Sequence, residues 1–118
     1  MVKIEDIAAA ALAGDSLYVR SLVQDFLRKH PQFVQVPRPV STDERIIALS
    51  ASLLELFAER AKQLPPTWTT EVGALSQPIF LLKAAQQMRR LRELCQAESP
   101  EPLRKRHLYA APGYLDYA

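Results

Sequence analysis

Glycine is the residue that most constrains this chain, because only three glycines occur among its 118 residues, beside nine prolines. Hairpin turns need residues with positive φ, and glycine supplies most of them. Three glycines therefore disfavour a many-stranded barrel or sandwich, and they exclude the glycine-rich loops that cradle nucleotide phosphates. Hydrophobic residues make up 48% of the chain, which is enough for one core. We expect a single helical domain over residues 1–118.

Prolines and capping residues divide the chain into segments whose apolar residues recur every three or four positions, as on the buried face of a helix. The expected long helices cover about 3–13, 16–29, 41–64 and 76–97, with one or two helical turns in 67–76 and a short helix over 99–106. Ser41 and Glu44 have the spacing of a capping box at the start of the third helix.

The order of these segments predicts an all-α fold with four main helices, one or two short helices and a packed C-terminal tail. A Pro-rich connector over residues 31–41 separates the second helix from the third. The junction at Gly14 is short enough for an antiparallel hairpin of the first two helices. The third helix carries the widest apolar arc, so we expect it to be central and the hairpin to pack on it.

Residue types that carry catalysis or bind metals are few. Cys95 is the only cysteine, His30 and His107 are the only histidines, and none has the spacing of zinc ligands. Cys95 falls on an apolar helix face, where cysteine acts as a small hydrophobic residue. Glu55 and Glu59 lie one turn apart, and we expect them on a solvated face. The sequence therefore predicts no enzyme, no cofactor and no metal site.

Targeting signals are also absent from the pattern of the sequence. The N-terminal residues lack the basic, then apolar, pattern of a secretory signal. The longest uncharged apolar run covers residues 7–13, against roughly 20 residues needed to span a bilayer. A single cysteine fits a reducing compartment. We expect a cytoplasmic protein that does not associate with membranes.

Charge is uneven along the chain, although the net formal charge is only +2. Residues 1–75 carry eight basic and nine acidic side chains, whereas residues 76–118 carry seven basic and four acidic ones. Arginine and tyrosine are enriched at interface hot spots, and the C-terminal third mixes both. The residues predicted to bind a partner are Arg89, Arg92, Arg104, Arg106, Tyr109, Tyr114 and Tyr117.

Several interpretations of this basic third remain open. The charges can form a solvated helix face, bind a protein partner, or bind nucleic-acid phosphates through Arg89, Arg90, Arg92 and residues 104–106. The apolar tail can complete the core or dock into another protein, and self-association is a further possibility. The predicted function is a non-enzymatic protein–protein interaction module, with a small helical nucleic-acid-binding protein as the alternative.

Three stretches carry a family resemblance: AAALAGDSLYVRSLVQDFLRK (9–29), TWTTEVGALSQPIFLLKA (67–84) and ESPEPLRKRHLYAAPGYLDYA (98–118). Together they resemble small stand-alone bacterial helical proteins without an established chemistry. Some of these are associated with operons of the toxin–antitoxin type, as the small partner of a larger protein. The resemblance implies an antitoxin-like or regulatory subunit and assigns no catalytic residue. The chain departs from familiar antitoxins, because it has no separate DNA-binding domain joined to a disordered tail.

Overall fold

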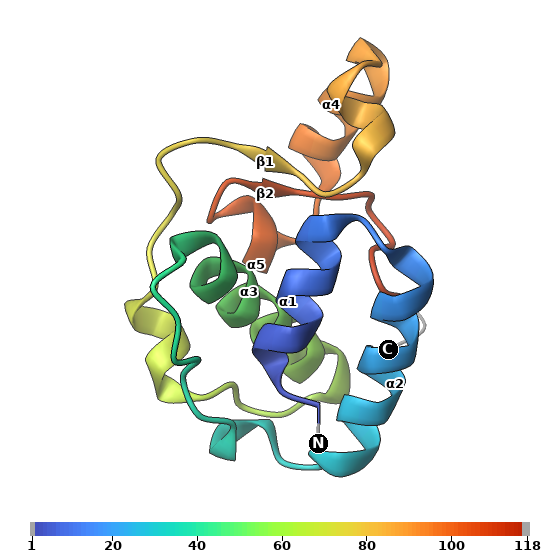
Figure 1. Cartoon of the computed structure of the whole chain (residues 1–118). Helices are drawn as coiled ribbons and strands as arrows, with labels where there is room; N and C mark the ends of the chain where they lie inside the picture. Colours follow the sequence, from blue (N-terminus) through green and yellow to red (C-terminus); the bar gives the residue numbers. More distant parts are fainter. Residues whose placement is uncertain (1, 117–118) are drawn as a thin grey trace.

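A computed structural model of the chain describes residues 2–116 (Figure 1). The α-helices are α1 (Ile4–Ala13), α2 (Ser16–Lys29), α3 (Glu44–Ala61), α4 (Arg89–Glu98) and the short α5 (Glu101–Arg104). Three 3₁₀ helices are η1 (Phe33–Gln35), η2 (Thr67–Glu71) and η3 (Lys83–Gln86). The strands β1 (Ile79–Phe80) and β2 (Leu108–Tyr109) pair in parallel. The predicted all-α class, with four main helices, is confirmed.

The first two helices form the predicted hairpin. Alanine favours the helical backbone of α1, and the Asp6 carboxylate closes its first turn by accepting from the Lys3 N–H at 2.9 Å. Gly14 ends α1 in the left-handed conformation with φ of 79°. Asp15 then caps α2 by accepting from the Tyr18 N–H at 3.1 Å. The direction of the chain therefore reverses over two residues.

Helix α3 lies at the centre of the described fold and packs against α1, α5 and η2. Ten of its eighteen residues are buried, which confirms the prediction of a central helix with several neighbours. The core joins α1, α2 and α3 to the C-terminal segment. Its largest fully buried apolar side chains include Ile4, Ile7, Val23, Phe26, Leu49, Leu53, Leu54, Leu103 and Leu108.

The predicted ends of α3 were wrong by a few residues. The N-cap is Asp43, whose carboxylate accepts from the Arg45 N–H at 2.9 Å, while the Ser41 hydroxyl accepts from the Asp43 N–H and shapes the preceding turn. Lys62 adopts a left-handed conformation with φ of 57°, and its N–H caps the last carbonyls of the helix. The helix therefore ends at Ala61 instead of reaching Leu64.

The prediction of one helix over residues 76–97 was wrong, because residues in the first half of this range pair with a strand that is distant in sequence. The Ile79 N–H donates to the His107 carbonyl at 3.0 Å, and the Leu81 N–H donates to the Tyr109 carbonyl at 2.8 Å. These two bonds hold Ile79 and Phe80 extended as β1. After the turn of η3, the chain becomes helical again only at Arg89.

The C-terminal segment packs on the chain's own core as far as Leu115. Leu108, Ala110 and Leu115 are all at least 90% buried. The Arg60 guanidinium of α3 donates to the backbone carbonyls of Leu115 and Tyr114, which fastens the segment to the end of that helix. Of the two interpretations that the sequence left open for the tail, the structure supports completion of the core.

The turn between α1 and α2 provides a test of the fold. We expect Gly14→Ala to lower the free energy of unfolding by about 1–2 kcal/mol, because an L-residue is strained at this φ. The added Cβ also falls 2.3 Å from the Lys83 Cε. Gly73→Ala is the matched control, since no atom lies within 4 Å of its Cβ position. Urea denaturation measures both variants, and equal unfolding free energies would contradict the prediction.

Candidate functional site

A buried arginine joins distant parts of the C-terminal half. Arg106 is 2% exposed, and its guanidinium donates to the Glu55 carboxylate at 2.6 Å. It also donates to three backbone carbonyls, those of Thr69 at 2.8 Å, Pro102 at 3.0 Å and Val72 at 3.1 Å. We predicted Arg106 as a partner-binding residue, but in this structure its donors are used inside the fold. Its role is structural, since a buried guanidinium needs these acceptors to offset its lost hydration.

Glu55 is the carboxylate at the centre of this cluster. The expectation that it lies on a solvated face was wrong: its side chain is 10% exposed, because α5 and the turn after it cover this side of α3. Lys105 pairs with it at 2.9 Å. Burial by itself raises the pKa of Glu55, but hydrogen bonds from Arg106 and Lys105 outweigh it and hold the pKa below its usual value. An ionised carboxylate held by two cations is poorly suited to act as a general acid.

The segment from Leu82 to Glu98 forms an arm that projects from the body (Figure 1). It consists of η3 and α4, and α4 packs most extensively on η3. Cys95 is the only buried residue of α4, and burial raises the pKa of its thiol. A helix with so little contact to the core contributes little to the packing of the body. We call residues 82–98 the arm.

Apolar side chains of the arm remain in solvent. Met88 is 57% exposed, Leu94 is 41% exposed and Leu82 is 37% exposed. Leu91 is half-buried. Leu91 and Leu94 are three residues apart in α4 and so project from neighbouring positions of the helix, and Met88 directly precedes its first turn. One side of the arm is therefore apolar and incompletely covered.

The arginines predicted to bind a partner differ in their availability. Arg92 donates to the carbonyls of Ala85 and Gln86, which fastens η3 to α4, and Arg104 donates to the Ala97 carbonyl at 2.9 Å. Both are thus bonded to backbone.

The arginines at the start of α4 project further into solvent. Arg89 is 88% exposed at its side chain and forms a 3.1 Å ion pair with Glu93. Arg90 is exposed, and its side chain forms no ion pair or hydrogen bond with the described part of the chain. The structure therefore does not bring the predicted arginines together as one patch.

The predicted tyrosines are also dispersed. The Tyr109 ring, on β2, packs on the Phe80 ring of β1 with 5.3 Å between centroids. Tyr114 is half-buried, and its carbonyl accepts from Arg60. Tyr117 lies outside the described residues. These contacts connect Tyr109 and Tyr114 to the body.

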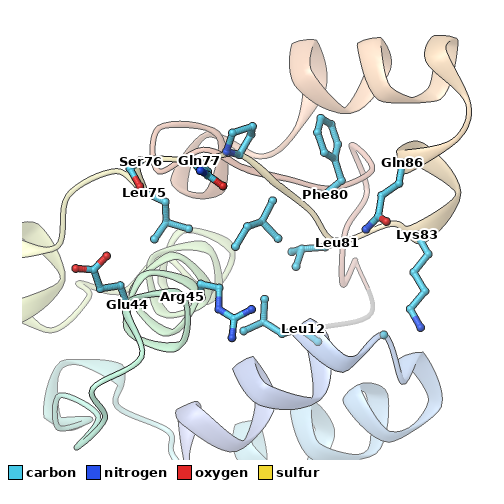
Figure 2. Close-up of a pocket in the computed structure, with 14 residues that line it drawn as sticks. Leu12, Glu44, Arg45, Leu75, Ser76, Gln77, Phe80, Leu81, Lys83 and Gln86 are labelled. Carbon is cyan, nitrogen blue, oxygen red and sulfur yellow. The ribbon is translucent and has the colours of Figure 1, made fainter.

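Sequence reasoning missed a cleft of about 480 Å³ between the end of α1, the start of α3 and the segment that leads into the arm (Figure 2). Apolar side chains of Leu12, Leu75 and Leu81 border it. Arg45 and Lys83 lie on opposite sides of it in Figure 2. The cleft was not predictable because it depends on β1, and the periodicity of residues 76–97 indicated a helix there instead.

Comparison with protein-family models, with curated proteins and with solved structures finds no match for this chain. Within residues 2–116, no group of three or more His, Cys, Asp and Glu side chains is placed to hold a metal ion. Among the described helices, none combines the length and apolarity required to cross a membrane. The resemblance to toxin–antitoxin partners therefore remains a prediction.

Removing the buried arginine should be far more costly than removing an exposed one. We expect Arg106→Ala to lower the free energy of unfolding by about 3–5 kcal/mol, because it leaves Glu55 and three carbonyls without their donor. Arg104→Ala, which removes an exposed arginine two residues earlier, should cost less than about 1 kcal/mol. Chemical denaturation followed by circular dichroism compares the two variants. Similar losses would show that the cluster does not stabilise the fold.

The lowered pKa of Glu55 predicts a pH dependence. A carboxyl whose pKa is lower in the folded state stabilises the fold above its unfolded pKa, and this contribution disappears as pH falls through the folded pKa. We expect the wild type to lose stability below about pH 4.5 more steeply than Glu55→Gln does. The difference between the two should be largest near pH 7 and shrink in acid. Parallel urea titrations from pH 7 to pH 3 measure it, with Glu59→Gln, an exposed carboxylate, as the control.

Proposed function

We propose that this chain is a non-enzymatic protein–protein interaction module whose contact surface is the arm. The observation that carries the proposal is the exposure of the arm: Cys95 is the only buried residue of α4, and Met88 and Leu94 remain in solvent. A ten-residue helix is marginal by itself in water, since most helical stability in proteins comes from packing of an apolar face. A partner that covers this face supplies the packing that the body does not.

The composition of the arm suits a protein partner. Burial of apolar surface contributes roughly 25 cal/mol per Å², so the half-covered leucines and methionine of the arm have free energy to gain. Methionine is also adaptable and adjusts to an irregular partner surface. The arm carries four cations, Lys83, Arg89, Arg90 and Arg92, against two carboxylates, Glu93 and Glu98. This excess favours a partner with an acidic rim around an apolar centre.

The resemblance to small partners of larger bacterial proteins agrees with this surface. An antitoxin-like or regulatory subunit needs a stable body and an element that another protein can grasp. The arm is such an exposed element, and it includes no residue of the buried cluster around Arg106. We therefore place the proposed interaction on residues 82–98, in preference to the tyrosine-rich tail.

Nucleic-acid binding is the weaker alternative on these contacts. Binding to phosphates requires several cations that are free to approach a backbone. Arg106 is buried, and Arg92 and Arg104 are bonded to carbonyls of their own chain. The cations that remain are interrupted by the ion pair between Arg89 and Glu93. The arm therefore supports a protein partner better than a phosphate backbone.

Exposed apolar residues of the arm provide the decisive variant. We expect the triple substitution Leu82→Ser, Met88→Ser, Leu94→Ser to abolish recovery of a specific partner from the native host by the tagged protein. Stability should change little, because these side chains are 37–57% exposed. The matched control is Leu17→Ser, Val34→Ser, Val40→Ser, which removes three exposed apolar residues, 83%, 50% and 97% exposed, outside the arm.

Recovery by the wild type and by the control, but not by the arm variant, would support the proposal. Equal recovery by all three proteins would contradict it. Light scattering of the purified protein, with and without the arm substitutions, identifies the case in which the partner is a second copy. A mobility-shift titration against duplex DNA and single-stranded RNA tests the alternative, since nucleic-acid binding would weaken steeply as salt is raised.

A further inference from the structure

Strand β1 has one edge paired and one edge open. The sheet of the described chain has two strands, and the Ile79 and Leu81 N–H groups both donate toward β2. Successive residues of a strand direct their backbone groups to opposite edges. The N–H and carbonyl of Phe80 therefore point away from β2. A donor and an acceptor at the correct spacing for another strand are thus presented at this edge.

The cleft lies along this part of the chain. Its wall includes every residue from 75 to 81 and no residue of β2, and its other wall is formed by the end of α1 and the start of α3. A strand rises about 3.3 Å per residue, so an extended peptide of five to seven residues would match a wall of this length.

The side chains around the cleft specify what such a peptide should carry. Leu12, Leu75 and Leu81 offer apolar contacts, as Figure 2 shows. Arg45 is already held by two hydrogen bonds from its side chain to the Asp43 carboxylate. Lys83, which crosses over Gly14, forms no ion pair with a described carboxylate. Lys83, at the end of the cleft next to the arm, is therefore the cation that an acidic side chain of a peptide would pair with.

We propose that this cleft binds an extended peptide segment of another protein, which adds to β1 as a third strand. The peptide carries apolar side chains toward the three leucines and an acidic side chain at the end next to Lys83. Main-chain hydrogen bonds to Phe80 supply affinity, and the leucines and the lysine supply specificity. An open strand edge is a template for such addition. The inference does not depend on the proposed function of the arm.

The first experiment identifies the peptide class. A library of random heptapeptides displayed on phage is selected on the immobilised full-length protein, and the enriched peptides are synthesised with a fluorescent label. We expect alternating apolar residues with an aspartate or glutamate toward one end. Anisotropy titration should show at least a tenfold weaker affinity for Lys83→Glu. The matched charge reversal Arg90→Glu, on the arm but outside the cleft, should bind within twofold of the wild type.

The second experiment tests strand addition itself. Peptides N-methylated at one position at a time lose a backbone donor without losing a side chain. We expect affinity to fall at alternate positions only, because every second N–H of an added strand faces β1. The triple arm variant described above should bind these peptides normally, so failure of the proposed function does not affect this result.

Three results of these two experiments would overturn the inference. These are a selection without enrichment, an N-methyl effect that does not alternate, and equal weakening by Arg90→Glu and Lys83→Glu. Equal weakening would place the peptide on the arm. Binding of free dicarboxylates with an affinity similar to that of the peptides would likewise identify a small-anion site instead of a strand site.

Discussion

The buried pair between Arg106 and Glu55 holds together the half of the molecule that the helical hairpin does not organise. Through this guanidinium, α3 is connected to η2, to the chain around Val72 and to α5. The Arg106 carbonyl also accepts from the Leu75 N–H, so the same residue fixes the position of the chain just before β1. A buried arginine with one carboxylate is stable only when its remaining donors are satisfied, and here three carbonyls satisfy them.

This pair also determines where the two surfaces lie. Directly after Arg106, His107 takes a positive φ of 66°, and its ring lies 2.7 Å from the Leu75 carbonyl. The chain then enters β2, which holds β1 extended beside the cleft. Because residues 79 and 80 are held extended, helical structure resumes only after Leu82, in the residues of the arm. The Arg106–Glu55 cluster therefore contributes no side chain to the arm or to the cleft, but the positions of both depend on it.

Local signals were sufficient for the N-terminal half of the fold and insufficient for the rest. Alanine content, the left-handed Gly14 and the cap at Asp15 are contained within a few residues, so α1, α2 and their hairpin followed from the sequence. The strand β1 depends on carbonyls nearly thirty residues away, which no local period reveals. Arg104 and Arg106 are the same residue type two positions apart, and only the fold separates an exposed cation from a buried one. The sequence therefore predicted a partner-binding surface rich in arginine and tyrosine, and the surface proposed on the arm shares Arg89 and Arg92 with that prediction.

Because the tail packs on the core, its apolar side chains are not available to the proposed partner. Burial of Leu108 and Leu115 removes the apolar side chains that made the tail a candidate for docking, while the arm keeps its own in solvent. The arm and the cleft adjoin at Lys83, which lines the cleft and begins η3. A charge reversal at Lys83 therefore disturbs both surfaces at once. Arg90 and the serine substitutions separate the arm from the cleft, and backbone methylation of the peptide isolates the strand edge, because no side chain of the arm can reproduce an alternating loss of hydrogen bonds.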